Sequence, residues 1–280
     1  MTTCTFAHGK HQLHYTTEGD PTNPALVMIH GWFSHRGVWH QTLAAVKDRF
    51  YCVAIDLLGF GDSDKPKDGD YSIETQGQRV LALVDSLGID RFTVIGHSMG
   101  GQTALCIASM LAPERVIKVV SVSGVAAAKL TPGVTRWVVP LVAMMYRLPF
   151  LVAMARVMSR NPWYAKKVSF WPWFYDMDGL PFSAWAVDRQ MAFQPGIAAA
   201  AYKTRRAITS LDLTVHLPKI TAPTLAIFGA QDATVPVSDG HLVDAHVPNS
   251  RLVLIDKCGH FPHYEHPEEY LQALETFLAE

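Results

Sequence analysis

The stretch from Arg91 to Leu111 reads RFTVIGHSMGGQTALCIASML, and it joins a strand-like run to a helix-like one. The run RFTVIG is mostly apolar on both faces, as in a buried parallel strand. The residues that follow Ser98 carry helical periodicity. Between them, Gly96-His97-Ser98-Met99-Gly100 fits the pattern G-x-S-x-G, in which a sharp turn presents a serine between strand and helix. The stretch predicts a buried sheet and a candidate nucleophile, Ser98.

Short apolar runs of the same kind recur on both sides of this stretch. They predict strands at 25–30, 51–56, 91–96, 116–121, 223–229 and 251–256. Segments with helical character are expected at about 38–48, 73–87, 99–111 and 267–278. An antiparallel edge is expected around residues 11–17. Strand–helix alternation implies right-handed crossovers, so the predicted fold class is α/β, with a mostly parallel central sheet flanked by helices.

The alternation is lost between Gly124 and about Leu211. This stretch holds six of the ten methionines, and ten aromatic residues lie between Trp163 and Phe193 alone. We expect an inserted, mainly helical cap at residues 125–210, over an α/β core formed by residues 1–124 and 211–280. The most membrane-like part, Trp137 to Met158, has a longest uncharged run of ten residues, about half a bilayer span, so no transmembrane segment is expected.

Composition and charge exclude several classes of function. The chain has 24 basic and 25 acidic residues, and it shows no basic footprint for a nucleic-acid partner. The N-terminus lacks a secretory signal, and the four cysteines are widely spaced without a CxxC motif, which favours reduced thiols and a cytoplasmic location. The cluster of His8, His11 and His14 lacks an acidic partner. We therefore expect no metal and no cofactor. The expected oligomeric state is a monomer or a homodimer.

A serine hydroxyl needs a base to act as a nucleophile, and the base needs an orienting carboxylate. The chain order Ser, then Asp or Glu, then His is typical of this arrangement in strand–turn–helix folds. His260 follows the last predicted strand directly and is the favoured base, with His263 and His266 as nearby rivals. Asp232 follows the strand TLAIFG and is the favoured acid, although an aspartate there also suits a turn or a helix cap.

Two backbone amides are candidate oxyanion donors. One belongs to Met99, directly after the candidate nucleophile, and the other to Trp32, in the run His30-Gly31-Trp32 that follows a predicted strand.

Two other features do not suit the site. Asp256 also ends a strand, but it is too close in sequence to His260 to face the imidazole ring. The glycine-rich stretch DLLGFGDS, from Asp56 to Ser63, lacks the third glycine of a phosphate-binding loop and is interpreted as a structural turn.

Taken in order along the chain, these motifs resemble the α/β-hydrolase superfamily, in its branch of small capped serine esterases and lipases. The resemblance runs from about residue 25 to the end of the chain, apart from the cap. It implies that Ser98, Asp232 and His260 form a catalytic triad and that the amides of Trp32 and Met99 form an oxyanion hole. It also implies hydrolysis of a carboxylic ester or lactone through an acyl-enzyme.

The methionine- and aromatic-rich cap suits a medium-chain acyl or aromatic group, because such side chains fit irregular apolar ligands. The residues expected to contact this apolar substrate are His30, Trp32, Met144, Trp163, Trp185 and Phe261. Two alternatives stay open. One is a C–C bond hydrolase acting on diketone ring-cleavage products, although Phe261 stands where those enzymes usually carry tryptophan. The other is a slow-turnover ligand sensor that retains the triad.

Overall fold

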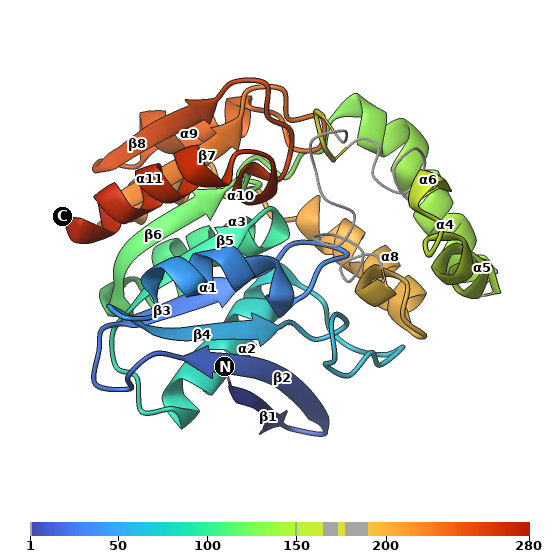
Figure 1. Ribbon diagram of the computed structural model, residues 1–280, viewed down its shortest axis with the longest axis horizontal. Coiled ribbons are helices and arrows are strands. Elements are labelled where there is room, and N and C mark those ends of the chain that lie inside the picture. The colour runs from blue at the N-terminus through green and yellow to red at the C-terminus, as the bar shows by residue number, and fades with distance from the viewer. Residues whose placement is uncertain (1, 149, 165–172, 177–189) are drawn as a thin grey trace.

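The computed structural model describes residues 2–148, 150–164, 173–176 and 190–280. In these residues one sheet has the strand order β1-β2-β4-β3-β5-β6-β7-β8 (Figure 1). The strands are β1 (Thr2–His8), β2 (His11–Glu18), β3 (Ala25–Ile29), β4 (Tyr51–Asp56), β5 (Phe92–His97), β6 (Val116–Val122), β7 (Thr224–Gly229) and β8 (Ser250–Ile255). Strands β3 to β8 are parallel, whereas β1 and β2 form an antiparallel edge that pairs with β4.

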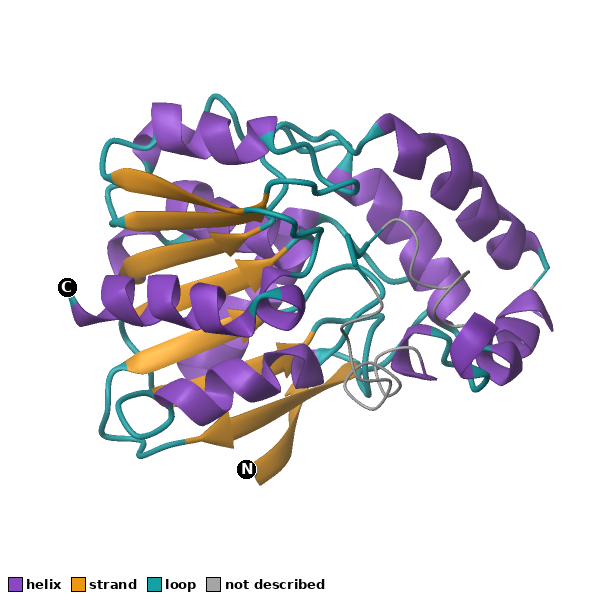
Figure 2. Ribbon diagram, turned by 45° about the horizontal axis from the view of Figure 1, so that its top comes forward, coloured by secondary structure: helices purple, strands orange, loops and turns teal. Residues whose placement is uncertain are grey.

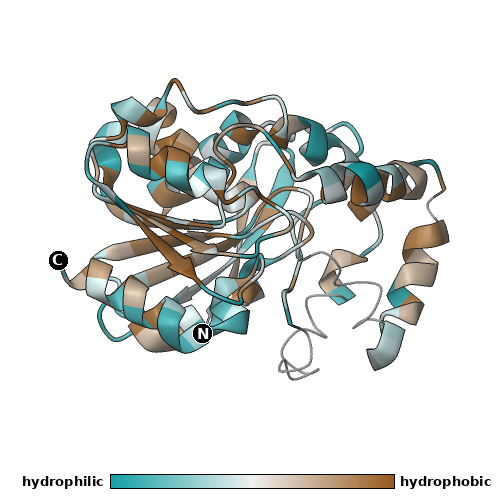
Figure 3. Ribbon diagram, turned by 90° about the horizontal axis from the view of Figure 1, so that it is seen from above, coloured by the Kyte–Doolittle hydropathy of each residue, from teal (hydrophilic) through white to brown (hydrophobic). Residues whose placement is uncertain are grey.

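Helices cover both faces of this sheet because its strands are apolar on both sides. Val27 and Ile29 of β3 belong to the core that also holds residues of α2 and α3, whereas Leu26 and Met28 pack on the opposite face with α1 and α11. The strands accordingly form an apolar centre between the helices (Figure 3). The helices are α1 (His40–Val46), α2 (Ile73–Ser86), α3 (Met99–Cys106), α4 (Val139–Arg147), α5 (Phe150–Met158), α6 (Pro162–Tyr164), α8 (Ile197–Ile208), α9 (Ser238–His246), α10 (Pro262–Glu265) and α11 (Pro267–Ala279).

Some local details differ from the sequence expectations. The segment expected at 38–48 consists of a 3₁₀ turn at Arg36–Trp39 followed by α1, and α3 continues beyond Cys106 as a π-helical turn. Helix α9 was not expected from the sequence. Only Asp239, Gly240 and Val243 of this helix are buried, so its sequence SDGHLVDAH shows little apolar periodicity.

Helices α4, α5, α6 and α8 lie together beyond the carboxyl ends of the parallel strands (Figures 1 and 2). They come from the part of the chain where strand–helix alternation is lost. The carboxyl ends of parallel strands are where ligands bind in α/β sheets. These helices therefore lie over the edge at which the candidate catalytic residues are expected. Within the described residues, no helix is both long and apolar enough to cross a membrane.

Candidate active site

Ser98 occupies a strained turn between β5 and α3. Its backbone has φ 57° and ψ −116°, a left-handed conformation that costs energy for a residue with a side chain. The turn can close because the residues two positions before and after Ser98 are glycines. A Cβ atom on Gly96 would lie 2.0 Å from the carbonyl oxygen of Gly100, and one on Gly100 would lie 2.1 Å from that of Ile29. This geometry explains why the G-x-S-x-G pattern needs both glycines.

Asp232 and His260 form a buried pair at the ends of β7 and β8. The Nδ1 atom of His260 lies 2.8 Å from Oδ2 of Asp232, and neither side chain is more than 3% exposed. The second carboxylate oxygen, Oδ1, accepts the backbone N–H groups of Thr234 and Val235 at 2.8 and 3.0 Å. Asp232 thus fixes its own turn and orients the imidazole at the same time. Because a carboxylate only accepts, Nδ1 of a neutral His260 carries the proton and Nε2 carries the lone pair.

His97, directly before Ser98, holds the backbone of His260. Its Nε2 lies 2.8 Å from the carbonyl oxygen of His260, and the two ring centroids are 4.7 Å apart. Burial lowers the pKa of His97 well below its usual value, and the neighbouring His260 and His263 lower it further. His97 is therefore neutral and donates from Nε2. Through this bond the turn of Ser98 and the loop of His260 are tied together.

The loop after β3 brings Gly31 against the serine turn. A Cβ atom on Gly31 would lie 2.8 Å from Nδ1 of His97 and 3.1 Å from Cβ of Ser98, so a side chain there would crowd the serine turn. Trp32 follows, and its indole N–H donates to the carbonyl oxygen of Ala201 in α8 at 3.1 Å. Met99 is the first residue of α3, where backbone N–H groups have no partner inside the helix. The two amides expected to bind an oxyanion thus belong to segments that flank Ser98.

A segment from the methionine- and aromatic-rich stretch binds the loop of His260. The carbonyl oxygen of Trp173 accepts the backbone N–H of His260 at 2.7 Å. Glu265 of α10 accepts the backbone N–H groups of Gly259 at 2.9 Å and of Tyr175 at 2.8 Å. Burial raises the pKa of Glu265, and backbone hydrogen bonds oppose that rise. Sequence reasoning missed Glu265, because nothing in the run PHYEHPEE distinguishes a clamping carboxylate from a solvated one.

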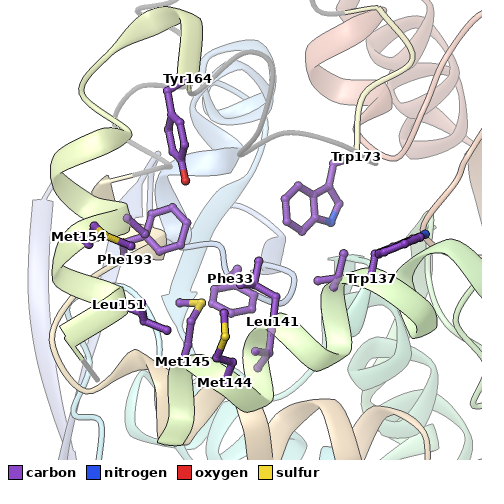
Figure 4. A pocket seen from close by; sticks show the side chains of 13 residues that line it. Phe33, Trp137, Leu141, Met144, Met145, Leu151, Met154, Tyr164, Trp173 and Phe193 are labelled. Carbon is purple, nitrogen blue, oxygen red and sulfur yellow. The ribbon is translucent and has the colours of Figure 1, made fainter. Parts of the chain in front are cut away.

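A cavity of about 280 Å³ opens between α4, α5 and this segment (Figure 4). Its described lining contains no charged side chain. Two lining residues connect the cavity to the candidate triad, since Phe33 follows Trp32 and the backbone of Trp173 binds His260, although Ser98 itself is not in the described lining. The other lining residues are Trp137, Val138, Leu141, Val142, Met144, Met145, Leu151, Met154, Ala155, Tyr164 and Phe193.

The expected substrate contacts fall into different places. Met144 lines the cavity, and Trp185 lies outside the described residues. Trp163 is 69% exposed and is absent from the cavity lining. Phe261 is buried and stacks on Phe174 with ring centroids 4.9 Å apart. Trp163 and Phe261 were expected to contact the substrate, but neither lines the cavity. Trp163 is exposed to solvent, and Phe261 packs against Phe174.

His30, another expected substrate contact, does not line the cavity either. It is fully buried, its Nδ1 lies 2.7 Å from the carbonyl oxygen of Gly31, and its Nε2 accepts the backbone N–H of Leu57 at 3.0 Å. Burial lowers its pKa to about 4, so the ring is neutral. His30 therefore holds the loop that carries Trp32. Sequence reasoning missed Phe33, Met145 and Trp173 as cavity residues, because an apolar side chain in this region could equally face the core.

The glycine-rich stretch after β4 is a structural turn, as expected. The Asp56 carboxylate forms an ion pair with Arg36 and accepts the backbone N–H of Asp62 at 2.9 Å. A Cβ atom on Gly61 would lie 2.2 Å from Oδ2 of Asp56, so the carboxylate fills the space of the turn. In the described part of the chain, no group of three or more His, Cys, Asp or Glu side chains is arranged to hold a metal ion.

Comparison with known proteins gives close matches over almost the whole chain. Residues 24–267 match the family model of the alpha/beta hydrolase fold. The chain is 30% identical over 269 residues to the pimeloyl-[acyl-carrier protein] methyl ester esterase of Nitrosomonas europaea, covering 94% of this chain and 98% of that protein. It is 31% identical over 234 residues to the 2-hydroxymuconate semialdehyde hydrolase of Pseudomonas putida, covering 81% and 76%.

A solved structure extends this similarity to three dimensions. The enol-lactonase from Burkholderia xenovorans LB400 superposes with a TM-score of 0.82 at 25% sequence identity, covering 99% of this chain and 100% of that chain. The names of the three proteins describe a methyl ester esterase, a semialdehyde hydrolase and an enol-lactonase. Together with the parallel sheet, these matches confirm the α/β fold class expected from the sequence.

Proposed function

This chain belongs to the α/β-hydrolase family and is a hydrolase, and on that premise we propose that it cleaves carboxylic esters, lactones among them, through a serine acyl-enzyme. The observation that carries the proposal is the strained turn of Ser98, tied through His97 to the loop on which His260 pairs with Asp232. Nucleophilic acyl transfer requires a serine that is presented to an imidazole, and an imidazole that a carboxylate orients.

In the proposed reaction Oγ of Ser98 attacks the ester carbonyl carbon and its proton passes to Nε2 of His260. The oxyanion that forms accepts hydrogen bonds from the backbone amides of Met99 and Trp32. Collapse of this intermediate expels the alcohol, which takes the proton from His260, and leaves an acyl group on Ser98. Water then attacks the acyl carbonyl and gives a proton to His260. When this second intermediate collapses, Oγ of Ser98 leaves and takes that proton back from His260, and the acid is released. Asp232 holds the imidazole and stabilises its charged form throughout.

The proposed substrate carries an uncharged medium-chain acyl or aromatic group. The cavity next to the candidate triad offers apolar side chains such as Phe33, Met145 and Phe193 and, among its described lining, no charge to pair with an ionic group. Sites of this kind bind ligands by apolar burial, and a few polar groups fix their orientation. The names of the relatives, an ester hydrolase and an enol-lactonase, agree with ester chemistry.

We also propose that residues 125–210 act as a cap over a core made of residues 1–124 and 211–280. Helices α4, α5 and α8 lie over the carboxyl ends of the strands, and Trp173 contributes both to the cavity and to the loop of His260. In this proposal the cap supplies the acyl-binding surface, whereas the core supplies the reacting groups.

A C–C bond hydrolase is a second candidate, favoured by the relative from Pseudomonas putida. The 2-hydroxymuconate semialdehyde in the name of that relative carries a carboxylate, with which a cationic side chain in the site would pair. The described lining of the cavity carries none, and Phe261 is packed under the loop of His260. We therefore place ester hydrolysis first.

The proposal is tested by labelling Ser98 with a fluorophosphonate, which reacts only with an activated serine, and locating the adduct by mass spectrometry. Ser98→Ala is expected to lower kcat on a p-nitrophenyl ester by about 10⁶-fold, and Asp232→Asn by about 10⁴-fold, as in other enzymes with this triad. Ser109→Ala is the matched control, because Ser109 is a buried helical serine remote from the triad.

Ester hydrolysis that survives in Ser98→Ala, with unchanged thermal unfolding, would refute the acyl-enzyme mechanism. Rapid labelling of Ser98 combined with negligible turnover on every ester would instead favour the ligand-sensor reading. Turnover of a diketone ring-cleavage product that exceeds turnover of every ester would favour the C–C hydrolase.

A further inference from the structure

The basic residues of this chain are concentrated in one segment. Between Glu114 and Asp176 the sequence contains nine Lys or Arg residues and no Asp or Glu, which leaves 15 basic residues against all 25 acidic ones in the rest of the chain. This segment includes α4 and α5. Arg115 and Lys118 of this segment belong to the core, whereas four of its basic residues lie on or next to α4 and α5: Arg136, Arg147, Arg156 and Arg160. A stretch with four arginines and no acidic residue attracts an anionic partner.

Helices α4 and α5 also expose apolar side chains. Leu141, Met144 and Leu148, in α4 and directly after it, follow one another at helical spacing and are 44–49% exposed. Phe150, Met154 and Val157 do the same on α5 at 50–63%. A helix of a globular core shows the opposite pattern, with its apolar stripe buried. We call these six residues the outer apolar face. Arg147 is the last residue of α4 and Arg160 follows the end of α5 by two residues, and both are exposed.

The cavity opens onto this face. Leu141, Met144 and Met154 line the cavity and are at the same time among the exposed large apolar residues. A side chain can do both only at the mouth of a cavity. An acyl chain entering here would therefore pass between the side chains of the outer apolar face (Figure 4).

We propose that the outer apolar face docks on an anionic lipid surface. An interfacial helix buries bulky apolar side chains at the boundary of headgroups and acyl chains, while arginines beside them bind lipid phosphates. The outer apolar face combines these two features along consecutive helices, and its cavity mouth would then open toward the lipid. A small acidic protein could pair with the arginines. Its surface would be mainly charged, however, and would not cover the apolar side chains of the outer apolar face. Delivery of an acyl substrate from this surface rests on the proposed function, whereas docking itself does not.

The test is sedimentation of the Ser98→Ala protein with vesicles of phosphatidylcholine, with and without an equal share of phosphatidylglycerol. Binding is expected to be stronger on the anionic vesicles and to weaken at high salt. Arg147→Gln with Arg160→Gln should lower partitioning on anionic vesicles by about 25-fold, at about fivefold for each arginine. Phe150→Ser with Val157→Ser should lower it by at least about tenfold on both vesicle types.

Val215→Ser and Arg91→Gln are the matched controls, since both residues are exposed and lie outside α4 and α5. All variants should keep their thermal unfolding and, with Ser98 restored, their turnover of a short soluble ester. Equal binding to both vesicle types, absent binding, or the same loss in the controls would overturn the proposal. Two further results would overturn it. One is a dimer of the unchanged protein that the double change Phe150→Ser and Val157→Ser dissociates. The other is binding of purified acyl carrier protein without any binding to vesicles. None of these outcomes affects the fluorophosphonate test of Ser98.

Discussion

At the scale of single residues, two buried histidines prepare the site without a role in the proposed proton transfer. His30 fixes the loop after β3 through Gly31 and Leu57, and His97 holds the carbonyl oxygen of His260. Burial lowers the pKa of both rings, so the folded protein keeps them neutral. Protonating either ring would leave a buried charge and would place a proton on a nitrogen that now serves as an acceptor or is enclosed.

This neutrality predicts acid destabilisation. The pKa of His30 is about 4 in the fold against 6.5 in an unfolded chain, so between these values the unfolded state binds more protons. Stability is therefore fully present above pH 6.5 and is lost as the pH falls toward 4, by about 3 kcal/mol from His30 alone. Urea unfolding measured across this range should show a smaller loss in His30→Gln than in the unchanged protein. His241→Gln, at an exposed helical position, should leave the slope unaltered; an equal slope in His30→Gln would contradict the assignment.

Residue-level prediction from sequence succeeded where local chemistry is distinctive. The turn of Ser98 is recognisable because glycine is required on both sides of a strained serine. His30 and Phe261 could not be assigned correctly, because their positions next to Gly31 and His260 suited a substrate contact as well as a packing role. Only the folded chain shows that Leu57 occupies Nε2 of His30 and that Phe174 covers the ring of Phe261.

At the scale of elements, α10 links two parts of the molecule that are distant in sequence. Glu265 accepts backbone N–H groups both from Gly259, beside the candidate base, and from Tyr175, beside the cavity residue Trp173. This one carboxylate therefore ties the wall of the cavity to the loop of His260. Neither hydrogen bond follows from periodicity, because both acceptor oxygens meet irregular backbone.

Replacing this carboxylate should separate substrate positioning from chemistry. In Glu265→Gln the amide NH₂ group faces a backbone N–H, so the clamp on Gly259 or on Tyr175 is lost. We expect kcat/KM for a long-chain ester to fall by about tenfold, mainly through KM, because losing one hydrogen bond to a charged group costs about 1.5 kcal/mol. Hydrolysis of an acetate ester should change little. Glu268→Gln, in the first turn of α11, is the control, and an equal loss on both esters would argue that Glu265 only supports the fold.

At the scale of the whole molecule, the sheet collects the proposed chemistry at one edge. Strands β3, β5, β7 and β8 are parallel, so the loops that follow them all emerge at their carboxyl ends. Those loops carry Trp32, Ser98, Asp232 and His260. Helices α4 and α5 lie beyond the same edge (Figure 2). Their side chains line the cavity. The proposed division between reacting groups and acyl-binding surface follows from this arrangement.

The cavity predicts a dependence on acyl length. Each methylene that becomes buried contributes about 0.8 kcal/mol, so kcat/KM of p-nitrophenyl esters should rise by up to about fourfold per methylene from acetate toward octanoate. Met145→Trp, which fills part of the cavity of about 280 Å³, should shift the optimum to shorter chains. Met110→Trp, in the π-helical turn after α3 and partly exposed, is the matched control, because Met110 does not line the cavity. A flat or falling profile in the unchanged protein would contradict an apolar acyl pocket.

The sequence by itself determined the alternation of buried strands and helices, the strained turn around Ser98 and the order in which the candidate acid and base follow. These features are local, because apolar periodicity, turn glycines and loops after strands act over a few residues. Only the tertiary structure decided that Asp232 meets His260 across 28 residues, that Glu265 clamps the segment of Trp173, and that Leu141 and Phe150 face outward. Those contacts depend on the crossovers of the sheet, which bring together positions whose separation along the chain carries no signal of their distance in space.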